Sequence, residues 1–217
     1  MICWSCEKNA GDGMLCAACG AIQPPDRGAD HFQVLGLQPR FDLDPAEIER
    51  RYKELTKVLH PDRFARADAR ARRASLERSV QLNDAWRTLS EPVRRAEYLL
   101  QRRGIDVGEA AGDRRKEGAA KATQPVSPAL LMEVMELRES LAEARAAGDL
   151  KEVGALAASV KGRQDQAMVA VAEEFAKPEP DLGAIASRLV SVRYYRRFLE
   201  EAQASQEAHE DASPPSD

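Results

Sequence analysis

Four cysteines, the only ones in the chain, lie within its first 19 residues as two Cys-x-x-Cys pairs: Cys3 with Cys6, and Cys16 with Cys19. Each pair makes a turn that directs two sulfurs toward one point, and zinc prefers four such soft ligands in a tetrahedron. We therefore predict a small zinc-knuckle module over residues 1–22, in which a structural Zn ion supplies most of the folding energy.

Two other chemistries are open to these cysteines. Two disulfides would need an oxidising compartment, and no charged-then-apolar leader precedes Cys3. A redox Cys-x-x-Cys pair usually accompanies a βαβ pattern, which the sequence does not have. Neither alternative fits the paired spacing as well as a metal does.

A second group of residues with possible chemistry is His60-Pro61-Asp62, which follows a segment with clear helix signals. Asp44 is placed to cap that helix, with Pro45 at its first position and Glu47 completing a capping box. Its core stripe would be Ile48, Tyr52, Leu55 and Leu59. At about 100° per residue, the opposite side carries Arg50, Lys53 and Lys57, and Pro61 ends the helix.

The remaining elements also read as helices. A brief helix over residues 30–36 precedes the capped one, a long helix is expected over about 67–89, and a shorter one ends near residue 103. Residues 104–126 are rich in glycine and alanine without an apolar period, which predicts a linker. Three helices should follow over 127–204, with caps at Ser127, Asp149 and Asp181. Short turns between them favour an antiparallel three-helix bundle.

The first helix of that bundle carries two stripes. Leu130, Val134, Leu137 and Leu141 suffice for packing. A second face, about 140° to 240° away, mixes methionine with carboxylates, which suits neither a core nor a purely solvated surface. That face consists of Met132, Met135, Glu136, Glu139 and Glu143, with Leu131 at its side.

The capped helix, the His-Pro-Asp loop and the long helix after it resemble the J domain. J domains bind ATPase chaperones of the DnaK class and stimulate their ATP hydrolysis. The resemblance implies that His60, Pro61 and Asp62 make this contact, supported by Arg50, Lys53, Lys57 and Arg63.

The segments Ala85-Trp-Arg-Thr-Leu, Arg95-Ala-Glu-Tyr-Leu-Leu and Leu130-Leu-Met-Glu-Val-Met-Glu-Leu-Arg-Glu-Ser-Leu closely resemble the HscB family of co-chaperones for iron–sulfur cluster assembly. The similarity spans about residues 31–200. It implies an all-α fold: a J domain over 30–103 and a C-terminal bundle over 127–204 that binds an IscU-type scaffold protein. The implied scaffold contacts are Leu131, Met132, Met135, Glu136, Glu139, Glu143 and, from the last helix, Tyr194.

The partners implied by this resemblance are an HscA-type chaperone of the DnaK class and the scaffold. A generic J-domain protein with another client is the alternative, and a zinc-ribbon nucleic-acid binder is a third. Nucleic acid is not favoured, because residues 1–30 carry only Lys8 and Arg27 against four acids.

We expect no enzyme activity, because the sequence has no phosphate loop and no nucleophile with a base beside it. No apolar run approaches the ~20 residues that cross a membrane, so we expect a cytoplasmic protein. The segment 205–217 is acidic, ends Ala-Ser-Pro-Pro-Ser-Asp, and is predicted to be a disordered tail.

Overall fold

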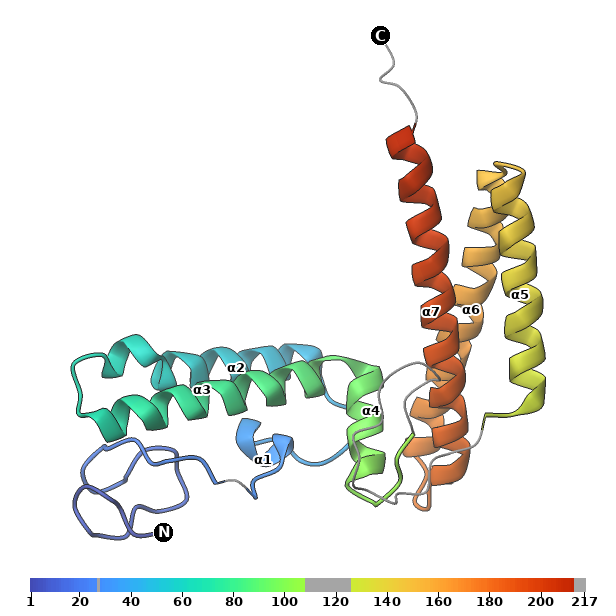
Figure 1. Cartoon of the computed structure of the whole chain (residues 1–217). Coiled ribbons are helices and arrows are strands. Elements are labelled where there is room, and N and C mark those ends of the chain that lie inside the picture. The colour runs from blue at the N-terminus through green and yellow to red at the C-terminus, as the bar shows by residue number, and fades with distance from the viewer. Residues whose placement is uncertain (27, 108–125, 213–217) are drawn as a thin grey trace. The chain divides into compact units, whose positions relative to one another are not determined.

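The computed structural model describes residues 1–26, 28–107 and 126–212, and its regular elements are helices (Figure 1). Within these residues the only extended pairings are two isolated bridges, Ile2 with Asn9 and Leu15 with Ile22. The chain divides into two compact units, Met1–Arg95 and Ala96–Asp217. The predicted all-α class is confirmed.

The N-terminal unit opens with the looped residues 1–26 and continues into three α-helices and one 3-10 turn. These are α1 (His31–Leu35), α2 (Pro45–Leu59), η1 (Pro61–Phe64) and α3 (Ala69–Ser90). Helices α2 and α3 lie side by side, and α1 packs against α3 (Figure 1). The buried side chains between them include Phe32, Leu35, Ile48, Leu59, Leu82 and Leu89.

Helix α2 begins as predicted, although its cap differs in detail. Asp44 is the N-cap, and its carboxylate accepts a hydrogen bond from the amide of Ala46 at 2.9 Å. The predicted capping box with Glu47 is wrong, because the Glu47 carboxylate lies 3.9 Å from the Arg50 guanidinium instead. A reciprocal capping box occurs on α1, where Asp30 and Gln33 exchange hydrogen bonds of 2.9 Å.

Helix α4 (Pro92–Gln101) begins in the N-terminal unit and ends in the C-terminal one. Arg95, the last residue of the N-terminal unit, is 5% exposed and donates a hydrogen bond of 2.7 Å to the carbonyl of Leu89. Its guanidinium also lies over the Phe41 ring, 5.3 Å from the centroid. The start of α4 is thereby fastened to the helix before it.

The C-terminal unit contains an antiparallel bundle of α5 (Pro128–Ala146), α6 (Leu150–Phe175) and α7 (Leu182–Ala212), which run side by side (Figure 1). Ser127, Asp149 and Asp181 accept hydrogen bonds from the first-turn amides of the three helices, as the sequence predicted. Gly148 has φ +67° in the turn between α5 and α6, a conformation that favours glycine. The four positions predicted to pack are all buried: Leu130, Val134, Leu137 and Leu141.

Most of the predicted linker, residues 108–125, lies outside the described residues. Helix α7 continues to Ala212, past residue 204, where the sequence placed the start of a disordered tail. Residues 205–212 contain glutamate, alanine and glutamine and no glycine or proline, so nothing in their composition ends a helix. In the described part of the chain, no helix is both long and apolar enough to span a bilayer.

Candidate functional site

The His-Pro-Asp loop directly follows α2, and its backbone is held by local hydrogen bonds. The amide of Asp62 donates to Nδ1 of His60 at 3.3 Å, and the amide of Arg63 donates to the His60 carbonyl at 3.0 Å. The carboxylate of Asp62 lies 3.5 Å from the same Nδ1. The His60 side chain is 50% exposed and that of Asp62 is 91% exposed. Both polar groups are therefore available to a partner.

The predicted basic face of α2 is exposed, and two of its three cations, Arg50 and Lys53, are paired along the helix. Arg50 lies 3.3 Å from the carboxylate of Glu54, and Lys53 lies 3.1 Å from that of Glu49. The hydrogen bond from Lys53 lowers the pKa of the Glu49 carboxyl. Exposed pairs of this kind stabilise a helix only weakly, so other acidic groups can replace them at little cost. Lys57, one turn further, is also exposed.

Two serines of α3 hold the end of α2, a role that the sequence analysis missed. Ser75 is fully buried, and its hydroxyl donates to the carbonyl of Leu59 at 2.7 Å; the hydroxyl of Ser79 approaches the same carbonyl at 3.4 Å. Leu59 is the residue immediately before His60. The carbonyls at a helix end lack partners within the helix, so these bonds help to set where the loop begins.

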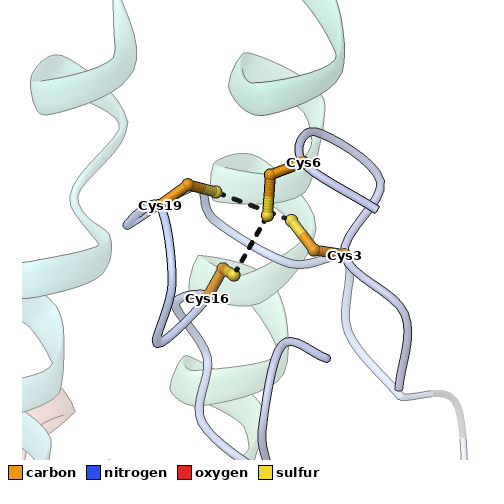
Figure 2. Close-up of side chains that lie close together, drawn as sticks. All are labelled: Cys3, Cys6, Cys16 and Cys19. Carbon is orange, nitrogen blue, oxygen red and sulfur yellow. Dashed lines mark hydrogen bonds between the residues drawn. The ribbon is translucent and has the colours of Figure 1, made fainter. Parts of the chain in front are cut away.

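The four cysteines converge on one point, as predicted (Figure 2). Their sulfurs all lie within 4.8 Å of one another, with Cys3 and Cys19 at 3.7 Å and Cys6 and Cys16 at 3.8 Å. A tetrahedral ion with metal–sulfur distances of about 2.3 Å requires sulfur–sulfur edges of about 3.8 Å. All four are free cysteines, and this spacing fits a shared metal ion rather than two disulfides.

The surroundings of the cluster shift the pKa values of two of its thiols in opposite directions. Burial raises the pKa of the Cys3 thiol, but hydrogen bonds from the amides of Cys6 and Ser5 and from neighbouring thiols lower it to about 6. The Lys8 amide lowers the pKa of Cys6, whereas the Cys19 thiol, burial and the other two thiols raise it to about 11. A cation bound here would take the sulfurs as thiolates, and the lowered pKa of Cys3 favours that form.

Gln23 is a further member of this site that the sequence analysis did not identify. It is 1% exposed, and its side-chain amide donates to the sulfur of Cys3 at 3.3 Å and to the carbonyl of Ala21 at 2.8 Å. A buried amide that donates to a sulfur supports the charge of a thiolate. A glutamine just after a cysteine cluster carries no sequence signal, because only its burial reveals the contact.

The structure places the second face of α5 in solvent. Met132 and Met135 are each 63% exposed and Leu131 is 41% exposed, while Leu130 and Val134 on the core side are buried. The three predicted acids of this face are exposed as well: Glu136, Glu139 and Glu143. An exposed cluster of large apolar side chains with an acidic rim is typical of an interaction surface.

Tyr194 of α7 is half-buried, and it is the adjacent Tyr195 that bonds to α5. The Tyr195 hydroxyl donates to the carboxylate of Glu133 at 2.9 Å, and Arg163 of α6 donates to the same oxygen at 2.5 Å. Burial and the bond to Glu133 raise the pKa of Tyr195 to about 12. Glu133 thus joins all three helices one residue away from Met132.

Comparison with known proteins supports the two halves separately. The family model described as DnaJ domain matches residues 30–98, and that described as HSCB C-terminal oligomerisation domain matches residues 126–203. An iron–sulfur cluster co-chaperone HscB homolog of Arabidopsis thaliana is 34% identical over 151 residues, which are 70% of this chain and 55% of that protein. An HscB homolog of Neisseria meningitidis, named a co-chaperone, is 33% identical over 156 residues, 72% of this chain and 87% of that protein.

The structural comparison agrees. The crystal structure of human HscB superposes with a TM-score of 0.81 at 28% identity, covering 95% of this chain and 98% of the human one. The fold and the exposed His-Pro-Asp loop therefore define a J-domain co-chaperone. Within that class, the chain belongs to the HscB family. The Arabidopsis relative in this family is named an iron–sulfur cluster co-chaperone.

Proposed function

We propose that this chain is an adaptor that binds an IscU-type iron–sulfur scaffold and delivers it to an HscA-type chaperone, whose ATPase it stimulates. The observation that carries the proposal is the exposed face of α5, where Leu131, Met132 and Met135 lie outside the core. Relatives named iron–sulfur cluster co-chaperones support the choice of client. Tethering raises the local concentration of the scaffold at the chaperone and needs no catalysis by the adaptor.

The composition of this face indicates what kind of surface it would bind. Burying two methionines and a leucine removes apolar area from water, which is favourable at roughly 25 cal/mol per Å². The neighbouring carboxylates Glu136, Glu139 and Glu143 would meet basic groups at the rim and speed up association. We therefore expect the scaffold to present an apolar patch bordered by lysine or arginine.

The chaperone would be contacted at the other unit, through His60, Pro61 and Asp62 with support from Arg50, Lys53, Lys57 and Arg63. Exposure of the His60 and Asp62 side chains, together with the cations along α2, supports this assignment. A partner surface that offers carboxylates to these cations and a hydrogen-bond donor to Asp62 would fit best. His60→Gln should abolish stimulation while leaving binding of the scaffold unchanged.

The deciding experiment measures steady-state ATP hydrolysis by the chaperone with this protein, with and without the scaffold. Synergy between the two proteins is expected. Stimulation without synergy would favour the alternative, a J-domain co-chaperone for another client. No stimulation in either case would refute the proposal.

Scaffold binding can be tested separately by calorimetry. Replacing Leu131, Met132 and Met135 by alanine should weaken the affinity at least about tenfold, since truncating residues central to an interface typically costs more than 1 kcal/mol each. Val169→Ala is the matched control, because Val169 is an apolar side chain of α6 that is 58% exposed outside this face. Tyr194→Ala tests the predicted contact on α7. Equal affinities for the triple variant and the control would contradict the assignment.

For the cysteine cluster we propose zinc, bound by Cys3, Cys6, Cys16 and Cys19. The tetrahedral spacing of the sulfurs and the sulfur-only donor set support a structural site with no open position. One Zn per chain should be found by elemental analysis, and Co²⁺ substitution should give the absorption of a tetrahedral thiolate complex. If the protein is produced in zinc-containing medium and the purified chain still carries no zinc, the proposal is contradicted. The cytoplasmic location remains a prediction.

A further inference from the structure

The cysteine module (residues 1–22) is docked on helix α3, and Arg78 holds the backbone that directly follows it. Arg78 is 8% exposed, and its guanidinium donates from Nε to the carbonyl of Gln23 at 3.0 Å and from Nη2 to that of Pro24 at 2.9 Å. Both acceptors are neutral backbone carbonyls directly after the module. A guanidinium is costly to bury without acceptors, so these bonds matter to α3 as much as to the module.

Other contacts extend this docking along the same side of α3. Arg70 lies over the ring of Trp4, 5.0 Å from its centroid, and Trp4 in turn donates to the carbonyl of Ile22 at 2.6 Å. Gln81 donates to the carbonyl of Asp26 at 2.9 Å. Residues 70, 78 and 81 are spaced by about two turns and one turn, which places them on one helix face.

Gln23 connects this docking to the cysteine cluster. Its side chain donates to the sulfur of Cys3, and its backbone carbonyl accepts from Arg78. The module has little apolar core of its own; its buried hydrophobic residues are Cys3, Ala10, Cys16 and Ile22. A segment this short depends on bound metal to fold. Metal binding therefore decides whether the two carbonyls are in place for Arg78.

The same turn of α3 also holds the end of α2, one residue before the His-Pro-Asp loop. Ser75 and Ser79, three residues before Arg78 and one residue after it, both donate to the carbonyl of Leu59. Two hydrogen bonds thus connect Cys3 through Gln23 to Arg78, and one turn of the α3 backbone joins Arg78 to the two serines that fasten the end of α2. These four hydrogen bonds are made by buried or half-buried groups.

The geometry points to Gln23 and Arg78 as positioning residues that make the hold of α3 on the His-Pro-Asp loop depend on metal at the four cysteines. Loss of the metal removes the acceptors of Arg78 and loosens the turn that carries Ser75 and Ser79. Stimulation of the chaperone then falls although the loop itself is intact. This inference rests on the proposed zinc site and the proposed chaperone contact, and it adds a link between them.

Coupling of this kind must be reciprocal, which makes it measurable at the metal site without any partner protein. In Arg78→Met the stem remains and both hydrogen bonds are lost, so Zn²⁺ should bind about tenfold more weakly than to the unmodified full-length chain. Affinity is read by competition with a chromogenic chelator. Arg73→Met is the control, because Arg73 is an exposed arginine of the same helix that pairs with Glu77.

A second measurement needs no variant. Hydrogen exchange of α3 and of residues 59–64 is compared in the zinc-loaded full-length chain and after EDTA has removed the metal. Faster exchange in both segments on metal removal is expected. Arg78→Met should show the faster exchange even when loaded, while Arg73→Met should behave as the unmodified chain.

Either of two results would overturn the inference: equal zinc affinities for Arg78→Met and Arg73→Met, or unchanged exchange in α3 and residues 59–64 after metal removal. Chaperone stimulation distinguishes this failure from failure of the proposed function. Equal stimulation by the loaded and stripped forms contradicts only the link to the loop. No stimulation by the loaded form contradicts the proposed function, and the affinity and exchange data still decide the coupling.

Discussion

Tyr195→Phe tests whether the hydrogen bond between Tyr195 and Glu133 stabilises the C-terminal bundle. The substitution removes one hydroxyl and keeps the aromatic ring of a residue that is only 8% exposed. Hydrogen bonds to charged groups contribute about 1.5–3 kcal/mol. Because the Glu133 side chain is 33% exposed and still pairs with Arg163, the low end of that range applies. We expect a loss of about 1.5 kcal/mol in the free energy of unfolding.

The measurement is urea unfolding at neutral pH, followed by circular dichroism. Tyr194→Phe is the matched control, since it removes a hydroxyl from the adjacent position without affecting Glu133. A double-mutant cycle with Glu133→Ala then isolates the pairwise term, because each single substitution removes the bond between the two side chains. Unfolding free energies that are equal for Tyr195→Phe and the unmodified chain would refute the reasoning.

The pH dependence gives a second check on the same bond. Burial and Glu133 raise the pKa of Tyr195 to about 12, above the value of about 10 for an unfolded chain. A raised pKa means that the stabilisation is complete below about pH 10 and is lost as the pH rises toward 12. The unmodified protein should therefore lose stability over this range more steeply than Tyr195→Phe does. Parallel losses in the two proteins would contradict the assigned pKa shift.

Three further predictions concern the ends and the core of the helices. Hydrogen bonding to Lys177 lowers the pKa of Glu174, so the stability that the Glu174 carboxylate contributes should be lost as the pH falls below about 4.3. Glu174→Gln should therefore flatten the acid side of a plot of stability against pH, and an unchanged acid side would contradict this. Ser75→Ala should cost about 1 kcal/mol and lower chaperone stimulation, because the Leu59 carbonyl loses its shorter bond; full stimulation would argue against that role. Leu141, which is 1% exposed, lies in the core of the bundle, so Leu141→Ala should lower the free energy of unfolding in urea by about 2–5 kcal/mol. A smaller loss would mean that the helices move together and fill the cavity that the substitution leaves.

Much of this fold was predictable from local signals. Caps at Asp44, Ser127, Asp149 and Asp181 sit next to the helices that they begin, so nearby residues are enough to locate them. The core stripe of α5 follows from helical spacing alone. The predicted partner of Asp44 was wrong for a physical reason: a glutamate at the third position can reach either back to the cap or forward to a basic residue. Here the Glu47 carboxylate lies near Arg50, and the capping-box motif alone does not predict which of the two contacts forms.

The candidate sites divide in the same way. The two Cys-x-x-Cys pairs and the His-Pro-Asp tripeptide are contiguous motifs whose spacing already brings their groups together, so the sequence sufficed to name them. Their supports were not predictable. Gln23 and Arg78 lie 55 positions apart, and Glu133 and Tyr195 lie 62 apart.

The sequence by itself determined which residues can form the metal cluster, the loop and the exposed face of α5, because each is encoded by short-range spacing along a turn or a helix. Only the tertiary structure decided what supports them. It buried Gln23 against Cys3, placed Arg78 on the two carbonyls that follow the cysteine module, and brought Tyr195 to Glu133. Such contacts depend on how helices pack, since a polar side chain acquires its hydrogen-bond partner only when another segment covers it.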